Sequence, residues 1–219
     1  MVDALEMILG QPARWDDPRL EDLKGRLLLV TAHRRESFGP PLEEICHAIA
    51  DLLAEHQDLT AVFPVHPNPS VREVVDRVLG TIPRVVLTAP LPYPPFVHLM
   101  RRADLILSDS GGVQEEAPSV GTPVLVLREV TERPEAIESG WAQLIGTSRK
   151  TIVETATQWL KKNRKKQMVH SSNPFGDGHA SERIAELLAS RVDRQPGIIR
   201  MSAEKQPSCG VGSDGPKRH

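Results

Sequence analysis

Residues Leu105 to Pro118 read LILSDSGGVQEEAP, which is the most informative stretch of the chain for its architecture. The stretch begins with an apolar run of strand length, passes through a pair of glycines and continues with helical spacing. In an open sheet of parallel strands, the loop between a strand and the next helix lies at the carboxyl edge, where ligands bind. The stretch therefore predicts a strand, a binding loop and a helix of an α/β sheet.

Other short apolar runs alternate with helical patterns along the chain. Together with residues 104–108 they are Arg26–Thr31, Thr60–Val65, Arg84–Leu87 and Pro123–Leu127. Continuous apolar strands joined by crossover helices are typical of a parallel sheet covered on both faces. We therefore predict a Rossmann-like α/β fold, a doubly wound parallel sheet of five strands. Apolar residues recur at helical spacing from Leu42 to Leu53 and from Val71 to Leu79, and later helices are predicted at residues 134–139, 149–160 and 180–189.

Length and charge indicate one folded domain followed by a tail. The chain has 219 residues with 27 basic and 29 acidic side chains, a net charge of −2. At roughly 100 to 200 residues per domain, we expect one domain, which we place at residues 1–190. Residues 191–219 contain few large apolar side chains and more basic than acidic ones, so we predict a disordered basic tail. The balanced charge disfavours nucleic-acid binding.

The sequence also predicts where the protein works. Cys46 and Cys209 have no cysteine or suitably spaced histidine nearby in the sequence, so we expect free thiols in a reducing cytoplasm. The apolar runs fall far short of the 18 or more residues that a membrane helix needs, and no signal peptide precedes them. We therefore expect a cytoplasmic protein without a membrane partner.

Ser110, Gly111 and Gly112 form a candidate anion-binding loop. Glycines lack the Cβ atoms that would obstruct a ligand, and the first N–H groups of a helix have no intrahelical acceptor, so a phosphate fits there. Glu115 and Glu116 lie about one turn further on, where a carboxylate can accept both hydroxyls of a ribose. A tight turn with an N-cap serine is the alternative interpretation. The glycines and the carboxylates together lead us to expect a nucleoside diphosphate. Because the loop matches neither the P-loop nor the GxGxxG pattern, we disfavour a P-loop NTPase and the hydride chemistry of a dinucleotide dehydrogenase.

Further candidates follow the other predicted strands. The Arg133 guanidinium can grip a diphosphate in a bidentate manner or form a structural ion pair with a neighbouring carboxylate. His33 and His66 each follow an apolar run, and each is either a structural histidine or a ligand-binding one. The ring of Phe96 either stacks on a base or packs in the core.

Five segments together resemble the non-hydrolysing UDP-N-acetylglucosamine 2-epimerase family. They are TAHRRESFG (31–39), HPNP (66–69), LILSDSGGVQEEAP (105–118), GTPVLVLREVTERPE (121–135) and NPFGDGHASERI (173–184). They occur in the family's order, and the resemblance covers about residues 2–190. It is a resemblance to the C-terminal half of a two-domain fold of glycosyltransferase-B type. The N-terminal family domain has no counterpart in this sequence.

The resemblance implies an isomerase that interconverts UDP-N-acetylglucosamine and UDP-N-acetylmannosamine in polysaccharide biosynthesis. UDP is eliminated to leave a 2-acetamidoglucal and is then added back, with inversion at carbon 2 of the sugar. No metal or other cofactor is implied, and a homodimer is common in the family. Because the family's acid and base carboxylates lie in the N-terminal domain, we expect a fragment that is inactive on its own. The alternatives are a non-catalytic UDP-sugar-binding module and a glycosyltransferase of the same architecture.

The resemblance also implies roles for individual residues in binding the diphosphate. Ser110, Gly111 and Gly112 would contact the phosphates. Arg133 and His33 would lie at the diphosphate, and His33 is the candidate catalytic residue.

The remaining implied roles concern the nucleoside and a second site. Glu116 would bind the ribose, whereas Phe96 and the backbone near Leu91 would contact the uracil. In some relatives a neighbouring regulatory site binds a second substrate molecule, and its residues here would be Arg34, Glu36 and His66.

Overall fold

Strand β1 (Arg26–Thr31) lies in the interior of the sheet, and its apolar run reflects burial on both faces. Side chains alternate along it, so that Leu27 and Leu29 belong to one hydrophobic core while Leu28 and Val30 belong to the other. A strand that is covered on both sides needs no polar face, which explains the unbroken apolar sequence. The computed structural model describes residues 2–162, 165 and 173–192.

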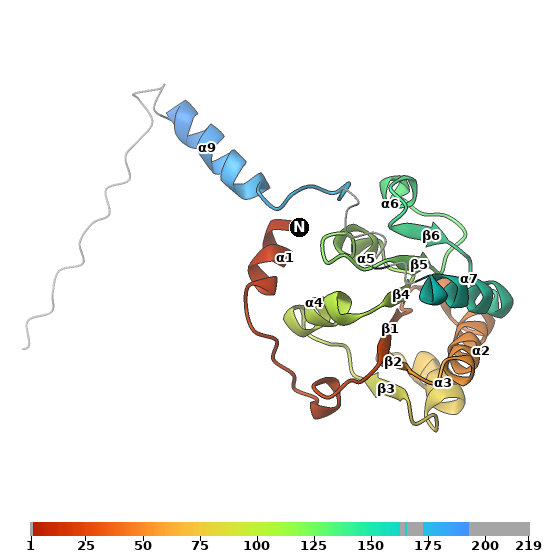
Figure 1. Cartoon of the computed structure of the whole chain (residues 1–219). Coiled ribbons are helices and arrows are strands. Elements are labelled where there is room, and N and C mark those ends of the chain that lie inside the picture. Colours follow the sequence, from red (N-terminus) through yellow and green to blue (C-terminus); the bar gives the residue numbers. More distant parts are fainter. Residues whose placement is uncertain (1, 163–164, 166–172, 193–219) are drawn as a thin grey trace, which may run out of the picture. The chain divides into compact units, whose positions relative to one another are not determined.

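Six parallel strands form one sheet in the order β3-β2-β1-β4-β5-β6 (Figure 1). Besides β1 they are β2 (Leu59–Pro64), β3 (Val85–Thr88), β4 (Leu105–Ser108), β5 (Val124–Val126) and β6 (Ala142–Leu144). Leu28 of β1 pairs with Ala61 of β2 on one side and with Leu105 of β4 on the other. The strand order reverses between β1 and β4, as in doubly wound sheets. The predicted Rossmann-like fold is confirmed.

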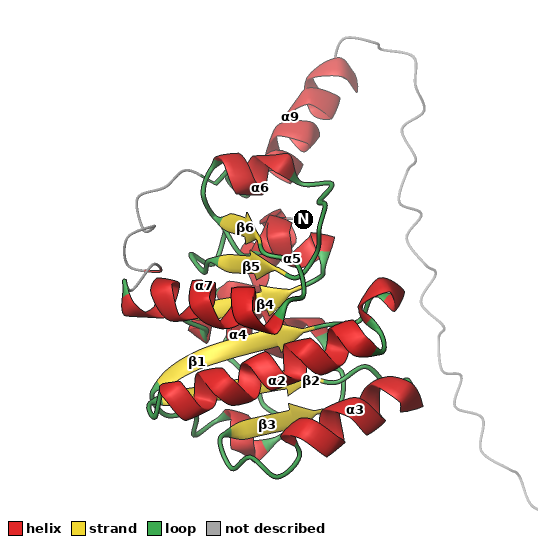
Figure 2. Ribbon diagram, turned by 90° about the vertical axis from the view of Figure 1, so that its right-hand side faces the viewer, coloured by secondary structure: helices red, strands yellow, loops and turns green. Residues whose placement is uncertain are grey.

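Helices cover both faces of this sheet (Figure 2). One core lies under α2 (Pro40–Glu55), α3 (Pro69–Leu79) and α7 (Arg149–Lys161). The other core takes side chains from α1 (Val2–Leu9), α4 (Tyr93–Arg102), α5 (Gly111–Glu116) and α6 (Pro134–Glu138). Two short 3-10 turns complete this arrangement, at Pro18–Leu20 and Arg35–Ser37.

The chain divides into two compact units, residues 1–181 and 182–219. Helix α9 (Ala180–Val192) begins in the first unit, and the rest of this helix is the described part of the second. Ile184, Leu187 and Leu188 of α9 have exposed side chains. Residues 193–219 lie outside the described part, so the boundary at residue 190 and the basic tail stay predictions. None of the described helices is long and apolar enough to cross a membrane.

Among the strands, the prediction differs from the structure in one. The five predicted strands and the later helices are present with ends shifted by up to a few residues. Strand β6 is absent from the prediction because it has three residues, lies at the sheet edge, and leaves Gln143 exposed. Cys46 is buried and forms no disulfide with a described residue, whereas Cys209 lies outside the described residues.

Candidate functional site

A cavity of about 320 Å³ opens at the carboxyl edge of the sheet. The strand order reverses next to it, between β1 and β4, where ligands bind in doubly wound folds. Segments that follow four different strands supply its wall, which is lined by Thr31, Ala32, His33, Pro64, His66, Pro90, Leu91, Phe96, Ser110 and Val113. Phe96 is also partly buried against the core, so the core-packing interpretation holds, and its stacking on a base stays a prediction. Five predicted site residues thus share one wall.

The loop between β4 and α5 presents main-chain N–H groups beside this cavity. Ser110 is the N-cap of α5, and its Oγ accepts a hydrogen bond of 3.5 Å from the N–H of Val113. The N–H groups of Gly111 and Gly112 donate to no acceptor among the described residues. Two adjacent free amides suit an oxyanion. Because α5 has only six residues, these amides are a stronger argument than the helix macrodipole.

Neither Gly111 nor Gly112 is required by the protein's own folding. Neither has a positive φ, and a Cβ added to either would lie no closer than 3.8 Å to its nearest neighbour. Gly25 contrasts with them, because its φ is +72° and an added Cβ would lie 2.2 Å from the carbonyl oxygen of Asp58. Glycine in a helix is unfavourable relative to alanine. Ser110 is the N-cap that the alternative interpretation expects, and phosphate binding at the glycine pair stays a prediction.

His33 lies between the cavity and the fully buried Asp109. The His33 Nδ1 atom is 3.1 Å from Asp109 Oδ1. Asp109 Oδ2 accepts hydrogen bonds from the N–H groups of His33 (3.0 Å) and Arg34 (2.9 Å) and from the Ser37 hydroxyl (3.0 Å). The contact with Asp109 raises the pKa of His33, although burial and Arg34 oppose it. Burial acts to raise the pKa of Asp109, but His33 and the main-chain donors leave this pKa below its ordinary value.

Glu116 lies one turn into α5 and accepts a hydrogen bond of 2.9 Å from the Tyr93 hydroxyl. Burial raises the pKa of Glu116, and the hydrogen bond from Tyr93 only partly offsets this. Burial and the contact with Glu116 together raise the pKa of Tyr93 to about 12. The Tyr93 hydroxyl thus holds the carboxylate of Glu116, the residue predicted to bind the ribose.

Arg133 forms the structural ion pair that the sequence left open. Its Nε donates to Glu115, and its Nη1 donates to the carbonyl of Glu132 at 3.0 Å. Neither Arg133 nor Glu116 is part of the wall of the 320 Å³ cavity. Their contacts with UDP therefore stay predictions.

The three residues of the predicted regulatory site lie in different surroundings. His66 lines the cavity, and its Nδ1 accepts a hydrogen bond of 3.2 Å from the N–H of Asn68. Glu36 pairs with Arg128 at 2.8 Å and lines a second cavity of about 290 Å³. Arg34 donates from Nε to the carbonyl of Asp109 at 3.0 Å. The regulatory role of these residues stays a prediction.

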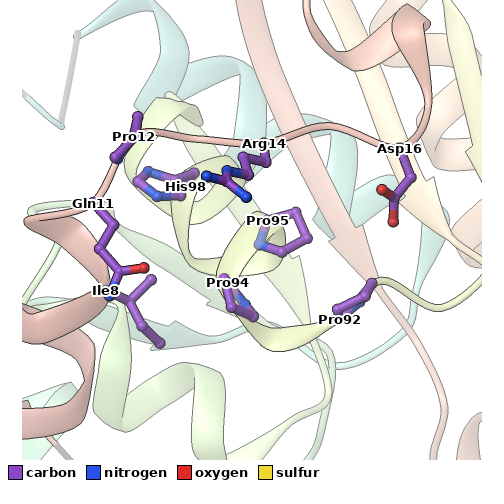
Figure 3. A pocket seen from close by; sticks show the side chains of 9 residues that line it. All are labelled: Ile8, Gln11, Pro12, Arg14, Asp16, Pro92, Pro94, Pro95 and His98. Carbon is purple, nitrogen blue, oxygen red and sulfur yellow. The ribbon is translucent and has the colours of Figure 1, made fainter.

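A larger cavity of about 530 Å³ lies between the segment after α1 and the beginning of α4 (Figure 3). Its wall combines prolines with a few polar side chains, including Arg14 and His98. None of the predicted site residues lines it. Its size alone therefore does not make it the functional site.

Two residues of the site were not assigned their roles by sequence reasoning, namely Asp109 and Tyr93. A polar residue directly after a buried strand was a signal for Asp109, since such residues lie at the ligand-binding edge. No local pattern connects Tyr93 with Glu116, because their hydrogen bond joins two separate helices.

Comparisons with known proteins identify relatives of this chain. A sequence profile of the UDP-N-acetylglucosamine 2-epimerase family matches residues 1–189. The UDP-N-acetylglucosamine 2-epimerase of Escherichia coli (strain K12) is 50% identical over 197 residues, which cover 86% of this chain and 52% of the relative. This chain thus spans about half the length of the curated relatives that it matches.

Solved structures give the same result. UDP-GlcNAc 2-epimerase from Neisseria meningitidis bound to UDP-GlcNAc has a TM-score of 0.76 and 38% identity, and the match covers 86% of this chain and 53% of that one. The C-terminal domain of a group 1 glycosyl transferase from Francisella tularensis, at 16% identity and a TM-score of 0.53 over 78% of this chain and 95% of its own, shares the fold alone. The expected C-terminal half of a glycosyltransferase-B-type fold is confirmed. The chain belongs to the UDP-N-acetylglucosamine 2-epimerase family.

Proposed function

We propose that this chain binds the UDP part of UDP-N-acetylglucosamine, and that the whole protein interconverts this sugar nucleotide with UDP-N-acetylmannosamine. One observation carries the proposal. The free amides of Gly111 and Gly112 adjoin a cavity whose wall includes Phe96, so a phosphate site and an aromatic surface occur together. In this arrangement the uracil contacts Phe96 and the backbone near Leu91, while the ribose meets Glu116.

The proposed reaction requires that UDP stays bound between its elimination and its return. Negative charge grows on the diphosphate as the glycosidic bond breaks, and preorganised donors stabilise this charge without having to reorient. Gly111 and Gly112 offer such donors in the main chain, with Ser110 beside them. His33, whose pKa is raised by Asp109, adds an imidazole that holds its proton more readily, and it is the proposed catalytic residue of this chain.

Calorimetric titration with UDP tests the proposal. We expect the wild-type chain to bind UDP, and Glu116→Ala and Arg133→Ala each to weaken binding, because each removes a charged contact worth about 1.5 to 3 kcal/mol. Arg149→Ala is the matched control, since it removes an exposed ion pair with Asp51 away from the cavity and should leave the affinity unchanged. Unchanged affinity in both site variants, with folding confirmed by circular dichroism, would contradict the assignment.

A UDP-sugar-binding module without turnover is a second candidate, and one observation favours it. No carboxylate is among the residues that line the 320 Å³ cavity, so the wall offers no acid or base of that kind for a proton on the sugar. The fold shared with the glycosyl transferase of Francisella tularensis gives the glycosyltransferase alternative no support of its own.

We further propose the cytoplasm as the working compartment, where the buried free thiol of Cys46 stays reduced. The homodimer implied by the family resemblance is also a proposal. Light scattering of the purified chain tests it, with twice the monomer mass as the expected result.

A further inference from the structure

Asp109 is a buried carboxylate at the centre of the candidate site, directly after β4. Its side chain has no exposed surface, and three donors converge on its Oδ2 atom. Its Oδ1 atom accepts no well-aligned hydrogen bond from the described residues, although His33 Nδ1 lies 3.1 Å away. An ionised carboxylate is costly to bury unless it is hydrogen-bonded and close to an opposite charge. The imidazole of His33 is therefore the neighbouring group that can offset the negative charge at Oδ1.

We propose that Asp109 is a positioning residue whose carboxylate turns the Nδ1 edge of the His33 ring inward and presents the Nε2 edge to the diphosphate. The inference rests on the proposed function, because the diphosphate of a UDP-sugar is the group that His33 would meet. About half of the His33 side chain is exposed, and the ring lines the 320 Å³ cavity. When a carboxylate engages one ring nitrogen, it fixes the orientation of the ring and the role of the other nitrogen.

The charges around His33 make Asp109 the group that favours the protonated ring. Arg34 follows His33 in the chain, its guanidinium is bonded to the carbonyl of Asp109, and its positive charge opposes protonation of the imidazole. His66 lies in the wall of the same cavity. Asp109 provides the opposing negative charge, and its contact outweighs both burial and Arg34 in raising the pKa of His33. A protonated imidazole has two N–H donors, so it can face the carboxylate and the diphosphate together.

The substitution Asp109→Asn separates this role from a structural one. The amide oxygen of asparagine can still accept from the N–H groups of His33 and Arg34 and from the Ser37 hydroxyl, so the segment keeps its three hydrogen bonds. The amide nitrogen would then face His33 Nδ1 and donate to it, which favours a neutral ring. The variant therefore changes the partner of the imidazole and retains the structural contacts.

Two measurements on the whole chain test the inference. Histidine side-chain NMR spectra are recorded over a pH series, with His33→Gln used to identify the His33 signal. We expect the wild-type His33 to titrate above the ordinary value of 6.5 and Asp109→Asn to lower its pKa by about one unit or more. In calorimetry, Asp109→Asn should weaken UDP binding about tenfold at neutral pH. The double variant His33→Gln, Asp109→Asn should bind like His33→Gln alone.

The outcomes are distinguishable. A wild-type His33 that titrates at or below 6.5 overturns the inference, and this measurement needs no variant, so it decides the matter even if Asp109→Asn does not fold. An unchanged His33 pKa and UDP affinity in folded Asp109→Asn overturn it, and so do losses that simply add in the double variant. If wild-type chain fails to bind UDP, the proposed function fails, whereas the NMR titration still reports whether Asp109 controls His33.

Discussion

At Gly112, the addition of a single Cβ atom should change both the stability of the protein and its affinity for UDP. An alanine there meets no clash within the protein, and alanine is the better helix former, so Gly112→Ala should raise the free energy of unfolding by about 0.5 to 1 kcal/mol. The added methyl group lies 3.8 Å from Ser110 Oγ, beside the proposed phosphate site, so UDP affinity should fall about tenfold. Thermal unfolding and calorimetry measure the two effects. Gly10→Ala, outside the site, is the control for binding, and undiminished affinity in Gly112→Ala would contradict a phosphate at these amides.

We expect Glu116 to lower the stability of the folded protein at neutral pH while it strengthens UDP binding. Because burial raises its pKa in the folded state, the folded protein favours the protonated form. The contribution of Glu116 to the free energy of unfolding should therefore be highest below the ordinary value of 4.5 and fall as the pH rises through the raised pKa. Glu116→Gln has no charge to desolvate and can still accept from Tyr93. It should be more stable than wild type at neutral pH and equally stable at acidic pH.

Chemical denaturation at several pH values measures this difference. UDP affinity should move the opposite way, since a neutral amide offers the ribose a weaker acceptor than a carboxylate does. Glu154→Gln is the matched control, because that carboxylate is exposed and forms only a loose surface pair with Lys150 at 3.9 Å. A Glu116→Gln variant less stable than wild type at neutral pH, yet still folded, would contradict the assigned cost of burial.

The helices and strands differ in how far their sequences predict them. Strands β1 and β4 are buried on both faces, so their continuous apolar sequences predict strands of a buried parallel sheet. Helices α2 and α3 each bury one stripe of residues at helical spacing, and this periodicity is local as well. Strand β6 has neither signal, because three residues at an edge are fixed by pairing with β5 and not by their own pattern.

The candidate site shows the same division between local and tertiary information. The loop at Gly111 and the strand-end position of His33 are readable because a parallel sheet collects such loops at one edge. The pairing of His33 with Asp109 joins positions 76 residues apart, and that of Tyr93 with Glu116 joins positions 23 apart. Spacing along the sequence predicts neither contact. The residues that orient His33 and Glu116 are therefore identified only from the folded structure.

Thr122 lies just before β5, at the amino edge of the sheet, and its side chain connects this edge to α4. Its hydroxyl is fully buried and donates a hydrogen bond of 2.7 Å to the carbonyl of Met100 in α4. Thr122→Val keeps the shape but leaves that carbonyl unpaired, so the free energy of unfolding should fall by about 1 to 3 kcal/mol. Thr60→Val is the control, since its exposed hydroxyl makes only a 3.4 Å contact with Lys24. Denaturant unfolding measures both.

UDP affinity should be the same in both threonine variants, since Thr122 lies at the amino end of β5 and the cavity at the carboxyl edge. A large loss of affinity in folded Thr122→Val would show that the two edges are coupled. A Thr122→Val variant as stable as Thr60→Val would contradict the structural importance of this hydrogen bond.

Across the whole molecule, the carboxylates nearest the site already have partners. Asp109 is bonded to main-chain donors and faces His33, Glu116 accepts from Tyr93, and Glu115 pairs with Arg133. The proposed reaction requires a group that removes the proton from carbon 2 of the sugar and one that returns it. This chain also spans about half the length of its curated relatives. We therefore expect this half of the protein to bind the UDP-sugar and another part to carry out the proton transfer.

We accordingly expect the chain to bind UDP-N-acetylglucosamine without converting it. Incubation in D₂O followed by proton NMR should show neither UDP-N-acetylmannosamine nor loss of the carbon 2 proton signal. Addition of the N-terminal half of the Escherichia coli relative should restore both, because proton-transferring groups would then face the bound sugar. The Gly112→Ala chain with the same added half should stay inactive, since it no longer holds the leaving group. Conversion by the chain alone would contradict this division of labour, and so would an inactive mixture in which UDP still binds.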